Sequence, residues 1–353
     1  MSSTKIIKIN SAEPEREYIS QAANLIARGG LVIIPTETVY GIAANALDQK
    51  ALDKLYEIKK RPLDKPFSLL ISQKDQVEEF ARNIPVVAYK LMRKFWPGPL
   101  TIIFRSIKQG KVGLRMPDNQ VALEIIQRSG VPVACPSANL SGDLAPTDFM
   151  QALKDMDGLV DLAIDAGQTK LGRESTIVDL TVEPWQIVRS GAIKDEEMIR
   201  VAKTKTVLFV CTGNSCRSVM AEAYLKNILQ KQKRTDVEVS SAGIMMLPGL
   251  GASQETQAVL KQEGIDVSSH RSQRITKELV KATDIILVME KIHEDKVLQL
   301  CPEVKNRLFL LKEFAKINEG NLGVLDPIGR SSEFYVNIFN IIKDAVERIS
   351  KIL

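Results

Sequence analysis

Short apolar runs alternate with longer amphipathic stretches along the second half of the chain. Three runs rich in Val, Ile and Leu, at residues 207–210, 237–240 and 285–289, are predicted as strands. Residues 221–230, 254–263 and 335–349 have the apolar spacing of helices. Strands that alternate with helices form parallel sheets covered on both faces. The second half is therefore predicted as an α/β domain with a doubly wound parallel sheet.

The first half has a different pattern, in which strand-like apolar runs are attached to unusual polar segments. These segments supply hydroxyl groups, one amide and several cations, and their glycines and prolines shape the loops. A concave site with this basic character suits a polyanion. The segments comprise residues 35–41, 59–62, 96–101, 113–117, 135–142 and 174–179.

A chain of 353 residues is too long for one ordinary hydrophobic core, so two domains are expected. Residues 194–200 are predicted as a polar helix, and a strand begins at about Thr206. We therefore place the first domain at residues 1–195, a linker at 196–204 and the second domain at 205–353. No internal repeat relates the two halves.

Composition and charge narrow the class of protein. Apolar residues make up 44% of the chain and charged residues 26%, as in soluble globular proteins. The chain starts without the apolar segment of a signal peptide, and no stretch approaches membrane-spanning length, so we expect a cytoplasmic protein without membrane contact. Four cysteines without a regular framework fit a reducing compartment. The net charge of +5 permits contact with tRNA without requiring it.

Residues 211–218, Cys-Thr-Gly-Asn-Ser-Cys-Arg-Ser, lie between a predicted strand and a good helix start. The five residues between Cys211 and Arg217 let backbone N–H groups converge on one anion, and the helix adds the positive end of its dipole. A thiol held there ionises easily, and the thiolate is the nucleophilic form of cysteine. Arg217 can hold two oxygens of a transferring phosphoryl group. The segment therefore predicts covalent phosphoryl-transfer chemistry.

A leaving group on phosphorus needs a proton donor, and the turn at residues 326–331 offers Asp326. Asp326 can donate that proton and then activate the water that hydrolyses phosphocysteine. With this element and the Ser-Ser-Ala-Gly turn at 240–243, residues 205–353 resemble the low-molecular-weight protein-tyrosine phosphatase family. The resemblance implies that Cys211 is the nucleophile, Arg217 the phosphate clamp and Asp326 the general acid. It also implies a phosphate loop shaped by Asn214 and Ser218, with Ser218 hydrogen-bonded to the sulfur, and completed by Thr212, Gly213, Ser215 and Cys216.

Two positions depart from the pattern of the tyrosine-specific members. Ser215 stands where a bulky aliphatic residue is usual, and Ile328 stands where an aromatic residue follows the Asp-Pro pair. Without that aromatic wall, an aryl leaving group loses stacking worth about 0.5–1.5 kcal/mol beyond its buried area. A small polar residue at 215 is similar to the protein-arginine phosphatase branch, which has Thr there. Phosphotyrosine and phosphoarginine in proteins therefore both stay open as substrates, and no cofactor is implied.

Cys216 has two interpretations. It forms a reversible disulfide with Cys211 that protects the nucleophile from irreversible oxidation, or it is a small buried filler. Zinc is a further explanation for two nearby cysteines, but the chain has only His270 and His293 and no second cysteine pair. No metal site is therefore predicted.

The polar segments of the first half occur in an order that resembles the YrdC-type threonylcarbamoyl-adenylate synthase family over nearly the whole of this half. The most specific marks are Lys59-x-Arg61 and Ser137-x-Asn139. The resemblance implies a twisted α/β sheet and the condensation of L-threonine, bicarbonate and ATP, with Mg²⁺, into threonylcarbamoyl-adenylate and pyrophosphate. This product serves the threonylcarbamoyl modification of adenosine 37 in tRNA. Proteins that transfer the group to tRNA are therefore implied partners.

The same resemblance assigns individual residues to the two larger substrates. The implied ATP-binding residues are Lys59, Arg61, Lys65, Lys111, Asn139, Thr147 and Arg189. The implied threonine-binding residues are Thr38, Arg115, Ser137 and Ser175. The chain has Lys65 and Leu70 where some relatives carry Asn and His, and the phosphatase-like half takes the place of the carboxy-terminal domain of longer synthases.

Three hypotheses about function follow. The preferred one is a bifunctional enzyme, with a synthase half and a phosphatase half. The second joins an RNA-binding first half to an active phosphatase. The third makes the phosphatase half a scaffold, against which the joint presence of Cys211, Arg217 and Asp326 argues. How the two activities are coupled, and the oligomeric state, are left open.

Overall fold

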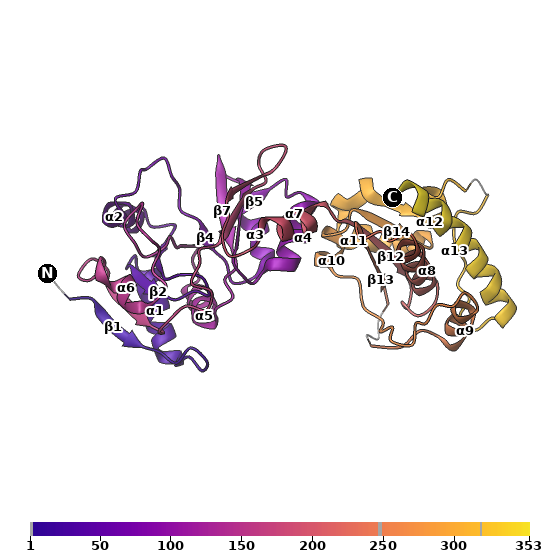
Figure 1. Cartoon of the computed structure of the whole chain (residues 1–353), viewed down its shortest axis with the longest axis horizontal. Coiled ribbons are helices and arrows are strands. Elements are labelled where there is room, and N and C mark those ends of the chain that lie inside the picture. The colour runs from indigo at the N-terminus through magenta and orange to yellow at the C-terminus, as the bar shows by residue number, and fades with distance from the viewer. Residues whose placement is uncertain (1–2, 246–248, 318–319) are drawn as a thin grey trace. The chain divides into compact units, whose positions relative to one another are not determined.

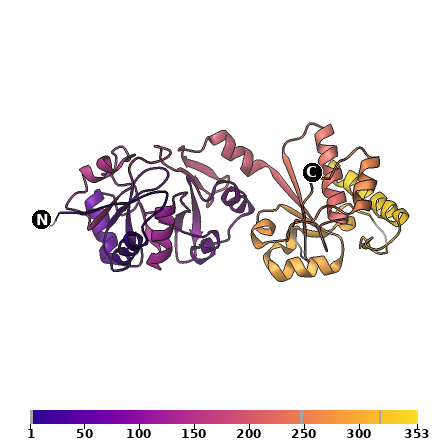
Figure 2. The same cartoon turned by 90° about the horizontal axis from the view of Figure 1, so that it is seen from below.

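A computed structural model describes residues 3–245, 249–317 and 320–353 of the chain (Figure 1, Figure 2). The chain divides into two compact units, residues 1–199 and 200–353. The boundary falls within helix α7, Asp195–Lys203, so most of the predicted linker is helical. Acidic residues occupy the first turn of α7 and basic residues its last turn, which complements the helix dipole.

Unit 1 contains a mixed sheet with the strand order β1-β9-β2-β3-β8-β4-β7-β6-β10-β11, and β5 pairs with β6. The strands are β1 Lys5–Lys8, β2 Val32–Ile34, β3 Gly41–Asn45, β4 Leu69–Leu70, β5 Ala81–Arg82, β6 Leu100–Ser106, β7 Lys111–Arg115, β8 Val133–Ala134, β9 Leu162–Asp165, β10 Thr176–Asp179 and β11 Gln186–Arg189. The helices are α1 Arg16–Ala27, α2 Gln49–Lys59, the 3₁₀ helix η1 Lys74–Gln76, α3 Val77–Phe80, α4 Val86–Phe95, α5 Gln120–Ser129 and α6 Phe149–Lys154.

Strand β2 shows how the sheet of unit 1 is covered on both faces. Successive side chains of a strand point to opposite faces. Val32 and Ile34 accordingly pack in a core with α1 and α5, whereas Ile33 packs in a second core with α2 and α6. The continuous apolar run is thus explained by burial on both sides, and the twisted α/β sheet expected for this half is confirmed.

Unit 2 contains a sheet with the order β13-β12-β14-β15, in which every neighbouring pair is parallel. The strands are β12 Lys205–Cys211, β13 Val237–Gly243, β14 Ile285–Val288 and β15 Leu308–Leu310. The helices are α8 Arg217–Lys231, α9 Gln254–Gln262, α10 Lys277–Lys281, α11 Lys291–Leu300, the 3₁₀ helix η2 Pro302–Arg307, α12 Leu311–Phe314 and α13 Ser332–Ile352. The predicted doubly wound parallel sheet is confirmed.

The turn predicted at residues 240–243 is wrong, because these residues continue β13. The strand stays paired with β12 as far as Gly243, which lies opposite Cys211. The small side chains that suggested a turn are needed instead for close packing beside the loop that follows β12.

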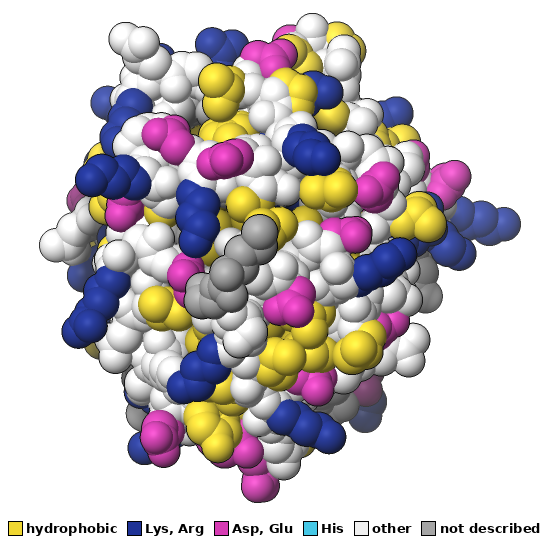
Figure 3. Space-filling view, turned by 90° about the vertical axis from the view of Figure 1, so that its left-hand side faces the viewer, with side chains coloured by type: hydrophobic (Ala, Val, Ile, Leu, Met, Phe, Trp, Pro, Cys, Tyr) yellow, Lys and Arg dark blue, Asp and Glu magenta, His cyan; other side chains and the backbone are white. Residues whose placement is uncertain are grey.

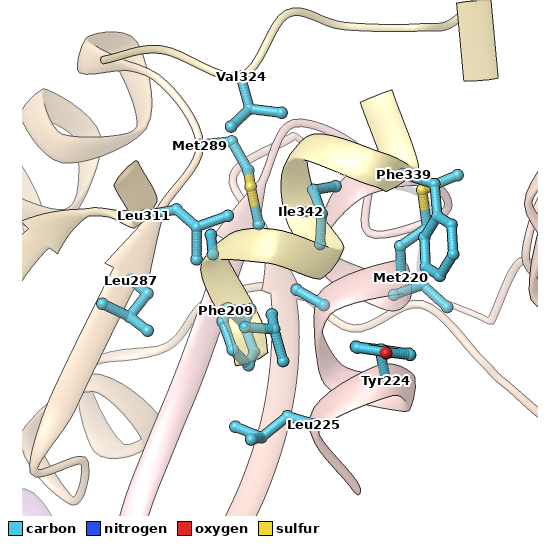
Figure 4. Packing of buried hydrophobic residues seen from close by; sticks show 14 of the residues in the cluster. Phe209, Met220, Tyr224, Leu225, Leu287, Met289, Leu311, Val324, Phe339 and Ile342 are labelled. Atoms are coloured by element: carbon cyan, nitrogen blue, oxygen red, sulfur yellow. The ribbon is translucent and has the colours of Figure 1, made fainter. Parts of the chain in front are cut away.

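The core of unit 2 lies on both faces of β12. Phe209 packs with Met220 and Tyr224 of α8 and with Phe339 and Ile342 of α13 (Figure 4). The rings of Tyr224 and Phe339 meet edge to face, with their centroids 5.6 Å apart. The alternate β12 side chains, Leu208 and Val210, pack against α10 and α11 on the opposite face. Both faces of this strand are therefore buried, as a doubly wound fold requires.

The exposed surface mixes charges of both signs. On the face drawn in Figure 3, Lys and Arg side chains are interspersed with Asp and Glu side chains. Within residues 3–245, 249–317 and 320–353, no helix has both the length and the apolar character needed to span a membrane.

We expect Ile342→Ala to lower the free energy of unfolding of unit 2 by about 2–5 kcal/mol, because it leaves a cavity in a close-packed core. The matched control is Ile352→Ala, whose side chain is 54% exposed in the same helix and should change stability by less than about 0.5 kcal/mol. Hydrogen exchange of α13 amides measures both effects. Equal losses in the two variants would contradict the packing described here.

Candidate functional sites

A cavity of about 130 Å³ lies in unit 1 between residues of β3, β6, β7, β10 and β11. Arg115, the last residue of β7, forms one buried wall. Its Nη2 donates to the Thr38 hydroxyl at 2.8 Å and lies 2.7 Å from Glu37 Oε1. The Thr38 hydroxyl is also 2.9 Å from that of Thr36. A guanidinium is thus held rigidly at the edge of the cavity.

Ser175 also lines this cavity. Its hydroxyl lies 2.9 Å from the Thr101 hydroxyl and accepts a hydrogen bond of 3.0 Å from Arg189 Nη2. Arg189 Nη1 is paired with Glu174 at 2.5 Å. Three of the four residues predicted to bind threonine, Arg115, Ser137 and Ser175, therefore line one cavity, and Thr38 contacts Arg115 at its edge.

A second cavity, of about 310 Å³, adjoins the first. Four residues line both cavities: Arg61, Ser137, Glu174 and Arg189. The predicted ATP-binding residues that line the second cavity are Lys59, Arg61, Lys65, Asn139 and Arg189. The structure thus places most of the implied nucleotide residues together, and next to the implied threonine residues.

Lys59 is the most deeply buried of the cations around the second cavity. It is the last residue of α2, and its Nζ donates to the carbonyl oxygens of Ser137 at 2.5 Å and Asn139 at 2.6 Å. Burial, together with the nearby Arg61 guanidinium, lowers the pKa of Lys59 to about 8. Because an ammonium has three N–H groups, one is left for a ligand in this cavity.

Two residues predicted to bind ATP lie elsewhere. Lys111 begins β7 and pairs with Asp179 at 2.7 Å, and Thr147 is bonded to Gln151 near the start of α6. Neither lines the two described cavities. The roles were implied by position in the chain alone. In the structure, Lys111 and Arg115 lie at opposite ends of β7, so Lys111 is remote from the cavity that Arg115 lines.

Sequence reasoning assigned no role to several side chains that line or support the first cavity. Glu37 is buried beside Arg115, and its Oε1 forms an ion pair with that guanidinium, whereas its Oε2 has no hydrogen-bond partner in the described structure. Cys135 lines the cavity, and burial raises the pKa of its thiol to about 12 despite the nearby Arg115 and Lys59. The signal that could have identified Glu37 is its place between Thr36 and Thr38 in the polar segment 35–41. Once buried there, its carboxylate requires a cation, which Arg115 supplies.

In unit 2 the loop after β12 encloses the buried Cys211. Its Sγ lies 3.0 Å from the hydroxyl of Ser218, which belongs to the first turn of α8. Asn214 adopts a left-handed conformation with φ of 54°. Its Nδ2 donates to the hydroxyls of Ser218 at 3.0 Å and Ser241 at 2.7 Å, and its Oδ1 accepts from the Gln273 N–H at 2.9 Å. Asn214 therefore connects the loop to Ser218, Ser241 and Gln273, and Ser218 contacts the sulfur.

The outer side of this loop is held by the continuation of β13. The N–H groups of Ile244 and Met245 donate to the carbonyl oxygens of Cys211 and Thr212, each at 3.0 Å. A Cβ added at Gly243 would lie 2.8 Å from the Thr212 carbonyl oxygen, so only glycine allows this approach. The loop backbone is thus fixed by backbone contacts before any ligand binds.

Arg217 is 1% exposed and directs its guanidinium at several acceptors. Nη1 donates to Glu290 and to the carbonyl oxygen of Val324 at 2.8 Å. Nη2 donates to the hydroxyl of Thr212 at 3.1 Å and to Asp326 Oδ2 at 2.5 Å. Nε is buried without a hydrogen-bond partner in the described structure. The structure thus brings Asp326 to Arg217 and leaves one N–H of the guanidinium for an anion.

Three further residues singled out from the sequence at this site, Ser215, Cys216 and Ile328, differ in burial and in contacts. Cys216 is the N-cap of α8 and a free cysteine, and its Sγ lies 3.5 Å from the hydroxyl of Ser253 and 3.6 Å from that of Tyr335. A disulfide with Cys211 stays a prediction. Ser215 is partly buried in the loop, whereas the Ile328 side chain is 58% exposed. The backbone N–H of Ile328 donates to Asp326 Oδ1 at 3.1 Å.

Sequence reasoning gave no role to three further side chains at this site. Glu290 pairs with Arg217, and His270 Nε2 is bonded to the Asn214 carbonyl oxygen at 2.8 Å. His293 is fully buried beside Thr212, and burial together with the Arg217 guanidinium lowers its pKa to about 4. These three residues could not be assigned to the site from the sequence, because they are distant from the loop in the chain and only the folded sheet brings them close to it. Among the described residues, no cluster of three or more His, Cys, Asp or Glu side chains is arranged to hold a metal ion.

Comparison with known proteins divides the chain at the same place. A family model described as telomere recombination, for the Sua5/YciO/YrdC family, matches residues 24–191. The model for low molecular weight phosphotyrosine protein phosphatase matches residues 206–353. A solved variant of Sua5 from Pyrococcus abyssi is 30% identical, covers 69% of this chain and 83% of its own, and has a TM-score of 0.53.

Curated relatives match each half separately. The threonylcarbamoyl-AMP synthase of Pyrococcus abyssi is 42% identical over 205 residues, which are 55% of this chain and 60% of that protein. A putative threonylcarbamoyl-AMP synthase of Methanocaldococcus jannaschii is 35% identical over 56% of this chain and 97% of its own length. The protein-arginine-phosphatase of Geobacillus stearothermophilus is 36% identical over 41% of this chain and 93% of its own length. This chain therefore spans some relatives almost completely and the longer Pyrococcus synthase only in part.

These matches define an α/β protein built from two families of phosphate-handling enzymes. The chain belongs to the Sua5/YciO/YrdC family in its first half and to the low molecular weight phosphotyrosine protein phosphatase family in its second half. Both resemblances predicted from the sequence are confirmed.

We expect the affinity of unit 1 for inorganic triphosphate to fall about tenfold from about pH 7 to about pH 9. The reason is that the Lys59 ammonium, whose pKa is about 8, is charged below this value and neutral above it. Calorimetric titration of the full chain measures the affinity. Lys59→Met should bind more weakly and lose this pH dependence, and an unchanged dependence in that variant would exclude Lys59 as its source.

Proposed function

We propose that the chain is a bifunctional enzyme that makes threonylcarbamoyl-adenylate in unit 1 and hydrolyses phosphorylated proteins in unit 2. The observation that supports the first activity is the pair of adjoining cavities that share Arg61 and Ser137. The observation that supports the second is the buried Cys211 in a loop completed by Arg217 and Asp326. The names of the matched relatives agree with both activities.

In unit 1, L-threonine would occupy the smaller cavity. Arg115 would pair with its carboxylate, and Ser175, which lines the same cavity, would offer a hydroxyl. Bicarbonate would join the threonine amine as a carbamate, with loss of one water molecule, at the junction of the two cavities, facing the α-phosphate of ATP. This arrangement brings both reactants into one geometry, which lowers the entropic part of the barrier.

ATP would occupy the larger cavity with its phosphates toward Lys59 and Arg61. These cations stabilise the negative charge that moves onto pyrophosphate as the carbamate attacks the α-phosphate. The cavity is also lined by the carboxylates of Asp143 and Glu174, which are oxygen ligands of the kind that Mg²⁺ prefers. When bound, Mg²⁺ supplies further neutralisation of phosphate charge. We assign the product to tRNA modification, with transfer proteins as partners, in keeping with the family.

In unit 2, the Cys211 thiolate would attack phosphorus. Arg217 would bind the phosphoryl oxygens through its unpartnered Nε, together with the loop amides. Asp326 would protonate the leaving oxygen or nitrogen and then remove a proton from the water that hydrolyses phosphocysteine. The Ser218 hydroxyl lies 3.0 Å from Cys211 Sγ, within hydrogen-bond distance of the proposed nucleophile.

Phosphoarginine in proteins is the preferred substrate of unit 2 in this proposal. Ser215 leaves the pocket without a bulky aliphatic wall, and the exposed Ile328 replaces an aromatic residue beside Asp326. An aryl leaving group loses stacking in such a pocket, whereas the N–H groups of a phosphoguanidinium can donate to a polar side chain such as Ser215. The match to a protein-arginine-phosphatase over 93% of its length agrees with this preference.

We expect the purified chain to release pyrophosphate from ATP and Mg²⁺ only when L-threonine and bicarbonate are both present. Arg61→Met should lower kcat/KM for ATP about 100-fold, because one preorganised cation at the reacting phosphates is lost. The matched control, Arg28→Met, alters an exposed residue after α1 and should leave the rate unchanged. If no pyrophosphate is released and structured RNA binds with steep salt dependence, unit 1 is an RNA-binding module instead.

We expect phosphoarginine peptides to be hydrolysed with kcat/KM at least equal to that for matched phosphotyrosine peptides. Ser215→Ile should move this ratio toward phosphotyrosine by about 2-fold to 10-fold, corresponding to about 0.5–1.5 kcal/mol of contact with an aryl group. Cys211→Ser should abolish turnover of both. A strong phosphotyrosine preference in the parent would refute the substrate assignment, and turnover by Cys211→Ser would refute the mechanism.

A further inference from the structure

The N-terminal end of α11 reaches the phosphate loop through two side chains. Glu290, the N-cap of the helix, pairs with Arg217. His293, one turn later, is fully buried, and its Nε2 lies 3.0 Å from the Thr212 hydroxyl. No role of His293 follows from the catalytic steps described above, yet the imidazole is one hydrogen bond away from the residue that holds Arg217.

The tautomer of His293 is determined by its second nitrogen. The backbone N–H of Glu290 donates to His293 Nδ1 at 3.0 Å. A backbone N–H is always a donor, so Nδ1 must be the unprotonated acceptor. In a neutral imidazole the proton then lies on Nε2, and Nε2–H donates to the Thr212 hydroxyl oxygen. The low pKa of His293, about 4, agrees with a neutral ring at physiological pH.

The Thr212 hydroxyl consequently accepts two hydrogen bonds. One comes from His293 Nε2 and the other from Arg217 Nη2, at 3.0 Å and 3.1 Å. A hydroxyl oxygen has two lone pairs, so both are used, and its rotamer is fixed from two sides. Its own O–H is directed away from both donors and is left to donate to an anion in the loop.

This arrangement matters most when Asp326 acts as an acid. In the present structure Arg217 Nη2 donates to Asp326 and to Thr212. When Asp326 turns to the leaving group, Thr212 is the acceptor that remains on Nη2 among the described contacts. Because the Thr212 hydroxyl is uncharged, it holds the guanidinium in place without neutralising its positive charge. A further carboxylate in the same place would neutralise part of that charge.

We propose that His293 is a positioning residue of the phosphatase site, which acts through the Thr212 hydroxyl to hold Arg217 in line with the phosphoryl group. The proposal rests on the phosphatase function proposed for unit 2. The alternative is that His293 only caps α11. In that case the hydrogen bond to Glu290 contributes to stability, and the hydrogen bond to Thr212 has no effect on the phosphatase reaction.

The first test observes the tautomer in the unmodified chain. The chain contains only His270 and His293, so ¹⁵N-histidine labelling gives two sets of ring signals, and His293→Gln assigns them. We expect the Nε2–H tautomer for His293 at neutral pH. A Nδ1–H tautomer would overturn the proposal, because it would reverse the donor and acceptor at Thr212.

The second test uses p-nitrophenyl phosphate with the full chain. His293→Leu and Thr212→Val should each lower kcat about 10-fold to 100-fold with a smaller change in KM, since the misaligned cation affects the transition state most. The double variant should be no slower than the slower single variant, because both changes break one chain of contacts. His293→Gln, which can accept from Glu290 and donate to Thr212, and Thr212→Ser should retain kcat within about threefold.

The outcomes separate positioning from capping. If His293→Leu lowers only thermal stability and leaves kcat per folded molecule unchanged, or if the two single effects add, the proposal is wrong. If the parent itself is inactive, the proposed phosphatase function fails. In that case the same variants are compared for their affinity for inorganic phosphate. Weaker affinity in His293→Leu and Thr212→Val, restored in His293→Gln, supports the positioning role. Unchanged affinity refutes it.

Discussion

A buried guanidinium is the charge around which the second unit is organised. Arg217 is removed from water and must therefore be surrounded by acceptors, which come from the loop, from α11 and from the segment around residue 324. Two carboxylates, those of Glu290 and Asp326, face this single cation. In the proposed reaction, an incoming phosphoryl group would therefore compete with Asp326 for the guanidinium.

Unit 1 uses the same principle with different residues. Arg115 is fixed by Thr38 and Glu37, and Lys59 is fixed by two carbonyl oxygens, so the cations do not have to be arranged after the ligands bind. Electrostatic stabilisation is strongest when the stabilising groups are preorganised in this way. In both units the positive groups are held by short local segments that follow strands, and the sheet provides the rigid support.

The sequence predicted the architecture well because apolar runs such as residues 207–210 have few alternatives once both faces are buried. Cys211, Arg217, Lys59 and Arg61 could be chosen as candidates because each lies within a short motif. The sequence could not point to Glu290 or His293, since their proximity to the loop depends on the pairing of β12 with β14. Lys111 does not line the cavity that Lys59 and Arg61 line for a related reason: its position along β7, and not its charge, determines what it contacts.

The backbone hydrogen bonds from Ile244 and Met245 to the loop after β12 have a consequence for how such a site diverges. Main-chain bonds are indifferent to side-chain identity but sensitive to chain length and register. Point substitutions at Ile244 or Met245 can therefore change the rim of the loop while its backbone keeps its shape. A single residue inserted between Gly243 and Ile244 would instead shift both donors, so this segment tolerates a change of side chain better than a change of length.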